Sequence, residues 1–442
     1  MRRHLAATAW AVAFVAAFTA PALLTLRSGE DSALASQLAV QAGLLATSAL
    51  VCAVAVPSRL RSLTRALGID GVLGVHRWIG MLAALLVLAH VVLVLAANPA
   101  NIALLDVRHA PRPANAGVAA TVTLVALVGL AVLRRRVRHH YELWRWVHLA
   151  LAGSVLVLSA LHIWWLGDLV HDPAVRTAFG LQAAVLLAVL GYRWVWRPVF
   201  DPRSEYTVRT VRPKSETAST LVLEPRRSSR HGAGHPTLTF APGQFAWLRL
   251  RRSTATGEHP FTITSSAHLG LWVEFTIRHA GDFTRTLAGL RSGDSVWLDG
   301  PHGGFTVDNV RSTGLVMIAG GVGITPMMSM LRTLAHRADR RQHRLVVAAR
   351  THEELMFRDE LESLQSALDL RIVEVISRAR GAAVPDQLDE ALLARVLPGR
   401  YRRNKFDYFV CGPPGMVTDV VTALDALDVR TSRIHTEQFD LV

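Results

Sequence analysis

The sequence predicts a six-helix transmembrane bundle, followed by an antiparallel β-barrel and then by an α/β doubly wound domain. Long apolar runs dominate residues 1–198, and short alternating segments between glycine and proline turns fill residues 203–308. In residues 312–442, apolar strands alternate with helical segments, which is the pattern of a parallel sheet covered by helices. We therefore expect three domains with these boundaries.

The composition excludes several classes of protein. Apolar residues make up 51% of the 442 residues and charged residues 19%, against roughly 45–50% and 25% in soluble proteins, so a disordered chain is excluded. Only Cys52 and Cys411 are present, too few for a disulfide framework, a four-cysteine zinc site or a thiolate-held iron–sulfur cluster. The formal net charge is +14, but the arginines are spread along the chain. We therefore expect no nucleic-acid partner.

Six apolar runs approach or exceed the roughly 20 residues that a lipid bilayer requires of a spanning helix. They cover about residues 5–26, 33–56, 72–97, 117–133, 142–166 and 177–197. The first run also resembles a signal peptide, with basic residues before it and the sequence Ala20-Pro21-Ala22 as a cleavage site. Its apolar stretch of about 22 residues exceeds the roughly 7–15 of a signal peptide, so we expect a retained span.

Arginine counts predict the orientation, because cytoplasmic segments carry the excess of positive charge. With a cytoplasmic N-terminus, nine arginines lie on the cytoplasmic side of the spans and four on the outer side. This places the C-terminal half in the cytoplasm and the bundle in the plasma (inner) membrane.

Four histidines lie deep in the apolar runs, and they form two pairs. His76 and His90 are 14 residues apart in the third run, and His148 and His162 are 14 residues apart in the fifth. Fourteen residues turn a helix to within about 40° of four full turns and advance it by about 21 Å, so both members of each run share one helix face. Because the two runs point the same way, His76 matches His148 in depth and His90 matches His162.

Buried ionisable groups in a membrane are costly and usually functional. Imidazole is a good axial ligand for haem iron, and facing helices of a bundle can hold a flat macrocycle between them. The histidines therefore predict two b-type haems, His76/His148 near the cytoplasm and His90/His162 near the outside. A metal-transport or proton-relay path is the alternative.

Two strings in the barrel region carry polar groups suited to a cofactor. The first is the eight-residue string HPFTITSS, residues 259–266. The second runs from Ile277 to Thr284 and predicts a strand that turns into a helix start, where backbone N–H groups, Thr284 and Arg278 would hold a pyrophosphate.

The α/β region contains a glycine-rich turn between a strand and a helix. The apolar strand 315–319 leads into Gly320-Gly321-Val322-Gly323-Ile324-Thr325-Pro326. Glycines let the backbone approach a dinucleotide phosphate, and the helix N-terminus favours its charge. Further strands are expected at 344–349, 371–376 and 406–411. The pair Ser377-Arg378 after one strand would bind an adenosine 2′-phosphate, and Cys411-Gly412-Pro413 ends another strand at the edge where ligands bind.

Together these strings resemble the ferric reductase and NADPH oxidase superfamily of transmembrane flavocytochromes, whose soluble half is similar to ferredoxin–NADP reductase. The resemblance covers nearly the whole chain and implies FAD, NADPH and two b-type haems. It implies flavin and ribityl contacts from His259, Pro260, Phe261 and Thr262, and phosphate contacts from Gly281, Asp282, Phe283 and Thr284. It assigns Gly321, Gly323, Thr325 and Pro326 to the nucleotide loop, Cys411 to Pro413 to the nicotinamide, and Phe439 to the stacking position on the flavin.

The expected activity is electron transfer from cytoplasmic NADPH to a small-molecule acceptor outside the membrane. A ferric chelate is the favoured acceptor, because nothing in the outer loops near 98–116 and 167–176 marks an oxygen site. His109, His171 and the arginines of these loops would attract anionic chelates and bind the metal transiently, although the same positive charge would also favour superoxide formation. The alternatives are a superoxide-generating oxidase, and a membrane-anchored flavoreductase that serves quinone or a protein acceptor.

Overall fold

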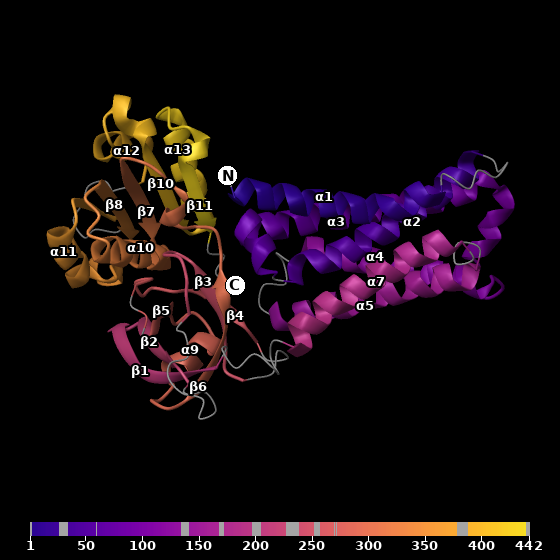
Figure 1. Ribbon diagram of the computed structural model, residues 1–442, viewed down its shortest axis with the longest axis horizontal. Coiled ribbons are helices and arrows are strands. Elements are labelled where there is room, and N and C mark those ends of the chain that lie inside the picture. Colours follow the sequence, from indigo (N-terminus) through magenta and orange to yellow (C-terminus); the bar gives the residue numbers. More distant parts are fainter. Residues whose placement is uncertain are drawn as a thin grey trace. The chain divides into compact units, whose positions relative to one another are not determined.

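The computed structural model describes residues 2–25, 34–58, 60–133, 141–167, 172–196, 205–226, 238–251, 257–268, 270, 272–377 and 388–438. The chain forms two compact units, residues 1–197 and residues 198–441. We call them the membrane unit and the reductase unit (Figure 1).

Six long helices form the membrane unit: α1 (Arg2–Thr25), α2 (Leu34–Ala55), α3 (Arg61–Ala97), α4 (Arg112–Val132), α5 (Tyr141–Leu166) and α7 (Pro173–Gly191). Each contains a stretch long and apolar enough to cross a membrane, which confirms the expected spans. They run alongside one another in Figure 1. In α2, 56% of this stretch is buried, whereas the other five have 17% or less. Their exposed apolar faces therefore suit contact with lipid.

Several helices begin earlier than their apolar runs predict, and for α4 and α7 the local sequence gives the reason. Helix α4 starts at Arg112 instead of 117, with Pro113 in its first turn, a position that proline favours. Helix α7 starts at Pro173 instead of 177, because the Asp172 carboxylate caps it by accepting the N–H of Ala174 at 2.7 Å. Capping and proline chemistry, and not apolarity, set these two starts.

A six-stranded antiparallel sheet opens the reductase unit. Its strands are β1 (Glu205–Ser215), β2 (Ala218–Pro225), β3 (Phe245–Arg249), β4 (His259–Thr262), β5 (Val273–Arg278) and β6 (Ser295–His302), in the order β4-β3-β6-β1-β2-β5. A bridge between Ile263, directly after β4, and Phe275 in β5 joins the two ends of that order. The sheet therefore closes on itself around an apolar core, and the predicted barrel is confirmed.

A five-stranded parallel sheet follows, formed by β7 (Gly314–Gly320), β8 (Gln342–Ala349), β9 (Leu370–Ile376), β10 (Phe406–Gly412) and β11 (Ile434–Gln438). The order is β11-β10-β7-β8-β9. Helices α10 (Ile324–His336) and α11 (Arg358–Ala367) pack on one face, and α12 (Glu390–Val396) and α13 (Pro414–Ala426) pack on the other. The doubly wound prediction is confirmed, with one strand, β11, that was not expected. The strand order reverses between β7 and β10, where ligands bind in such sheets.

Candidate functional site

The two histidine pairs expected from sequence spacing do face each other in the bundle. The ring centres of His76 and His148 are 6.2 Å apart, and those of His90 and His162 are also 6.2 Å apart. A metal–imidazole bond is about 2.0–2.1 Å long, so two imidazoles bound on opposite sides of one metal have ring centres about 6 Å apart. Both pairs are therefore spaced so that they would hold one metal between them.

Backbone carbonyls orient three of the four rings. The Nδ1 atoms of His76, His90 and His162 lie 2.8, 2.8 and 2.7 Å from the carbonyl oxygens of Ala53, Ala39 and Pro113. A carbonyl only accepts, so Nδ1 is the donor and Nε2 keeps its lone pair. Metal-binding histidines commonly have this arrangement, because the second nitrogen fixes the tautomer and the ring orientation.

A cavity of about 400 Å³ adjoins the outer pair. His90 and His162 lie in its wall among aliphatic side chains, with Thr47, Thr121, Ser159 and Asn101 as the polar members. Within the described residues, no group of three or more His, Cys, Asp or Glu could hold a metal ion. Two imidazoles fall short of the four ligands that a zinc ion takes, whereas a haem would bring its remaining nitrogen ligands with it. The donor set therefore fits haem.

The string HPFTITSS places an aromatic cluster at one edge of the barrel. His259 and Phe261 lie on β4, and both rings are close to Phe283, with ring centres 4.2 and 6.2 Å away. The two strings that the sequence singled out are thereby brought together. Thr262, the last residue of β4, has a buried hydroxyl without a hydrogen-bond partner in the described part of the chain. A buried hydroxyl of this kind is suited to bonding a polar group of a bound cofactor.

The turn before helix α9 (Asp282–Ala288) is organised by Thr284. Its hydroxyl accepts the N–H groups of Ala280 and Gly281, both at 3.0 Å, and donates to the Gly281 carbonyl at 2.8 Å. The first bond of the helix runs from the Arg285 N–H to Gly281. The N–H groups of Asp282, Phe283 and Thr284 precede that bond, so they have no partner within the helix.

The glycine-rich loop lies beside β10, at the reversal of strand order. Residues 321–323 form a 3₁₀ turn, held by the Thr325 hydroxyl, which donates to the Val322 carbonyl at 2.9 Å. A Cβ on Gly323 would lie 2.2 Å from the carbonyl oxygen of Cys411. Only glycine therefore fits there. Pro326 is buried in the first turn of α10, and Cys411 is fully buried in the core beneath the loop.

A cavity of about 730 Å³ opens along the carboxyl ends of the parallel strands. Gly320, Gly321, Ser377 and Pro413 line it, together with Arg278 from the barrel. Sequence reasoning did not place Glu354 or Met416 there, although both line the same cavity. Arg378 and Phe439, expected at the 2′-phosphate and on the flavin, lie outside the described residues, as does His171.

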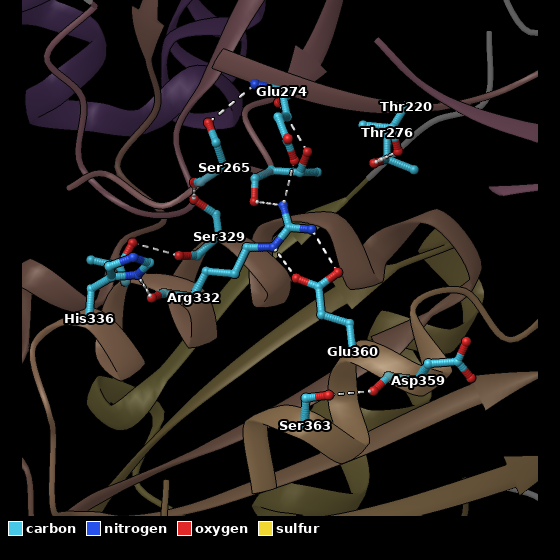
Figure 2. Close-up of polar contacts among 12 residues, drawn as sticks. Thr220, Ser265, Glu274, Thr276, Ser329, Arg332, His336, Asp359, Glu360 and Ser363 are labelled. Carbon is cyan, nitrogen blue, oxygen red and sulfur yellow. Dashed lines mark hydrogen bonds and ion pairs between the residues drawn. The ribbon is translucent and has the colours of Figure 1, made fainter. Parts of the chain in front are cut away.

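Arg332 on α10, missed by sequence reasoning, joins the nucleotide-binding fold to the barrel (Figure 2). Its guanidinium donates to both carboxylate oxygens of Glu360, at 2.6 and 2.8 Å, to Glu274 at 3.1 Å and to the Thr264 carbonyl at 2.7 Å. Burial alone would lower the pKa of Arg332, but Glu360 and Glu274 outweigh it and hold that pKa above its usual range. Burial would likewise raise the pKa of Glu360, but Arg332 holds it below its usual range. Arg332 is the only Lys, Arg, Asp or Glu in helix α10, and that was the available signal.

We call the contact between helix α10 and the barrel the seam. Hydroxyl groups on α10 extend it beyond Arg332. Ser329 donates to the Ser265 carbonyl at 3.0 Å and accepts the Gly243 N–H at 3.2 Å, and Thr333 accepts the Ala267 N–H at 3.0 Å. Helix α10, which begins at the glycine-rich loop, is therefore hydrogen-bonded to the segment that contains the string HPFTITSS, residues 259–266.

Three family profiles match consecutive parts of the chain. Residues 42–159 match the ferric reductase like transmembrane component, residues 214–306 an FAD-binding domain and residues 317–422 the oxidoreductase NAD-binding domain. With the six apolar helices and the two folds of the reductase unit, these matches define an integral membrane oxidoreductase that binds FAD and NAD(P)H. The chain belongs to the superfamily of ferric reductases and NADPH oxidases, whose soluble module is ferredoxin–NADP reductase-like.

Relatives of known activity match parts of the chain. The reductase component of propane 2-monooxygenase from Mycolicibacterium smegmatis is 30% identical over 251 residues, 55% of this chain and 68% of that protein. The flavohemoprotein of Bacillus subtilis is 27% identical over 235 residues, 51% of this chain and 56% of its own length. The FAD/NAD-binding domain of nitric oxide dioxygenase from Vibrio cholerae aligns with 53% of this chain and 98% of its own, at 24% identity and a TM-score of 0.45.

Proposed function

We propose that the protein transfers electrons from NADPH to an acceptor on the opposite side of a membrane, with a ferric chelate as the favoured acceptor. The observation that carries this proposal is the equal distance of 6.2 Å between the ring centres of the two histidine pairs. His76, His90 and His148 lie within residues 42–159, which match the ferric reductase component, and His162 follows three residues after that match. When bound, FAD would accept a hydride and pass on its two electrons one at a time with release of the proton, and two b-type haems would supply one-electron carriers within the bilayer.

In this proposal, residues 1–198 form the haem domain, with His76 and His148 as inner ligands and His90 and His162 as outer ligands. The Nδ1–H bonds to backbone carbonyls hold three of the rings in the tautomer that binds iron. The wall of the outer cavity is mostly aliphatic, as suits a largely apolar macrocycle.

Residues 203–308 would bind FAD. His259, Pro260, Phe261 and Thr262 lie on one strand, where Phe283 closes the aromatic cluster over them. We assign the ribityl chain to the buried Thr262 hydroxyl. We assign the phosphates to Arg278 and the turn of residues 281–284, where the N–H groups of Asp282, Phe283 and Thr284 are the donors.

Residues 312–442 would bind NADPH in the cavity of about 730 Å³. Gly320, Gly321, Gly323, Thr325 and Pro326 shape the loop at the phosphates. Cys411, Gly412 and Pro413 form the strip beside the nicotinamide, Ser377 and Arg378 hold the 2′-phosphate, and Phe439 stacks on the flavin.

The excess of arginine on one side of the spans supports a cytoplasmic position for the reductase unit, below the plasma (inner) membrane. On the outer side, the loop after α3 presents an exposed His109, whose Nδ1 lies 2.7 Å from the Asp106 carboxylate. An imidazole beside a carboxylate suits transient contact with ferric iron. This observation favours iron over oxygen, quinone or a protein acceptor.

Proteoliposomes with NADPH on the side of the reductase unit test the proposal. We expect ferric-citrate reduction on the far side, without oxygen, and a weaker rate when His109 and His171 are both replaced by alanine. Superoxide on the far side with no loss in the double variant would identify an oxidase. An absorption spectrum without b-haem bands would reject transmembrane transfer and leave a membrane-anchored flavoreductase.

A further inference from the structure

Two segments of the membrane unit repeat one pattern. Residues 39–47 on α2 read AVQAGLLAT, and residues 113–121 on α4 read PANAGVAAT. They are identical at four of nine positions, Ala42/Ala116, Gly43/Gly117, Ala46/Ala120 and Thr47/Thr121, and they carry equivalent side-chain amides, Gln41 and Asn115. We call them the two cradle segments.

Each cradle segment holds one outer histidine in the same way. The first carbonyl of each segment accepts the imidazole Nδ1–H, from His90 to Ala39 at 2.8 Å and from His162 to Pro113 at 2.7 Å. The glycine four residues later lies under the ring. Its missing Cβ would be 3.0 Å from the same Nδ1 atom in both cases, inside the contact distance of about 3.5–4.0 Å between non-bonded carbon atoms.

The threonine at the end of each segment completes the correspondence. The Thr47 hydroxyl donates to the Gly43 carbonyl at 3.0 Å, and the Thr121 hydroxyl donates to the Gly117 carbonyl at 2.9 Å. Both threonines and both glycines line the cavity beside the outer histidines. The threonines are therefore internally bonded, and neither hydroxyl is left unpaired in an apolar wall.

The inner pair is held differently. His76 donates to the carbonyl of Ala53, and the residue four positions later is Pro57, which has no N–H to compete for that carbonyl. No glycine of the described residues has an inner histidine among the nearest atoms to its added Cβ. A Cβ at Gly43 or Gly117 should therefore disturb only the outer pair.

We infer that Gly43 and Gly117 are positioning residues for the outer histidines, and that helix pairs α2–α3 and α4–α5 each supply one half of a repeated cradle. This inference rests on the proposed function, because it assigns the outer pair to a haem. The glycines leave space for each ring to reach its carbonyl, and the carbonyl fixes the ring and its tautomer. Losing such an orienting contact weakens a metal site by about 10–100-fold.

The experiment replaces Gly117 by alanine in the full chain, with Gly129→Ala as the matched control. Gly129 lies on the same helix α4, and a Cβ there meets no atom within 4 Å. The purified variants are compared by haem-to-FAD ratio and by the low-spin haem signals in electron paramagnetic resonance. We expect Gly117→Ala to bind haem at the outer site about 10–100-fold more weakly, so it should lose the outer haem signal and about half of its haem. The control Gly129→Ala should match the wild type.

Gly43→Ala is the second variant, because its Cβ meets His90 at the same 3.0 Å. The same selective loss in both variants supports the repeated cradle. Two intact haem signals in both variants would overturn the inference. Loss of both haems in these variants, with Gly129→Ala unaffected, would also overturn it, because the glycines would then be needed for the packing of the whole helix bundle. A wild-type protein without haem would instead reject the proposed function.

Discussion

In the membrane unit, imidazole rings are oriented by backbone carbonyls of neighbouring helices, whereas in the reductase unit helix α10 is held by charged side chains. The difference follows from the surroundings. A carbonyl can accept a bond inside a bilayer without placing a charge there, where charge is costly. In the reductase unit, the carboxylates of Glu274 and Glu360 are partly exposed and compensate the buried Arg332. The two units should therefore respond differently to substitution.

The largest expected effect comes from removing an inner histidine. His76→Ala leaves His148 without its partner ring at 6.2 Å, so we expect loss of the inner haem and a fall of transmembrane ferric-citrate reduction to background. Reduction of soluble ferricyanide by NADPH on the side of the reductase unit should persist, because that unit folds around its own cores. A full two-haem content in His76→Ala would contradict the pairing.

The next effect concerns nucleotide choice in the reductase unit. One charge-assisted contact to a phosphate contributes roughly 1.5–3 kcal/mol, or about ten- to a hundredfold. Arg378→Ala should lower the NADPH/NADH ratio of kcat/KM by that factor. Arg350→Ala is the comparison, because Arg350 lines the same cavity after the preceding strand. If the ratio falls in Arg350→Ala and not in Arg378→Ala, the 2′-phosphate contact is to be assigned to Arg350.

Arg332→Met tests the charged seam itself. The change removes the partner of Glu360, while Glu274 keeps its pair with Arg212. We expect the reductase unit to lose roughly 2–3 kcal/mol of stability, below the full cost of an unpaired buried charge because Glu360 is a third exposed. Thermal unfolding followed by flavin fluorescence measures this. In the control Arg337→Met, the lost pair with Asp308 is more exposed, so less than about 1 kcal/mol is expected. Equal shifts in both variants would show that the seam contributes no special stability.

The smallest effect is a pH dependence of the same seam. Arg332 holds the folded-state pKa of Glu360 below its usual value. The ion pair between them therefore stabilises the folded state fully above the unfolded-state pKa of about 4.3, and this stabilisation is lost as the pH falls through the folded-state pKa. The melting temperature of Glu360→Gln should therefore lie below that of the wild type at pH 7 and approach it under acid conditions. A constant difference across pH 3–7 would mean that Glu360 contributes through packing and not through charge.

Much of the architecture could be predicted from sequence because it depends on composition and period. Apolar length indicated the spans, and the 14-residue spacing paired the histidines by depth, as their ring contacts now show. Strand β11 was missed because Ile434–Gln438 is a polar strand at the edge of the sheet, where a continuous apolar run is not needed.

The partners of the functional side chains could not be predicted in the same way. Every residue has a carbonyl, so nothing in the sequence marks Ala39 or Pro113 as the acceptor for a particular imidazole. The cradle segments share only four residues, all of them small or hydroxyl-bearing. In helices rich in alanine, such a short match is not specific enough to indicate a repeat. Their equivalence becomes evident only when both are seen under an outer histidine.

The seam around Arg332 also limits how this protein can be recombined with its relatives. A chimera that exchanges residues 312–442 alone would bring a foreign helix in place of α10. The native barrel would lose the Arg332 bonds to Glu274 and to the Thr264 carbonyl, while Glu274 keeps its pair with Arg212. The functional unit of exchange therefore extends back into the barrel, at least to the string that contains Thr264 and Ser265 and to strand β5. A graft that carries both parts together preserves these bonds of helix α10, so chimeras of this protein should exchange whole reductase units.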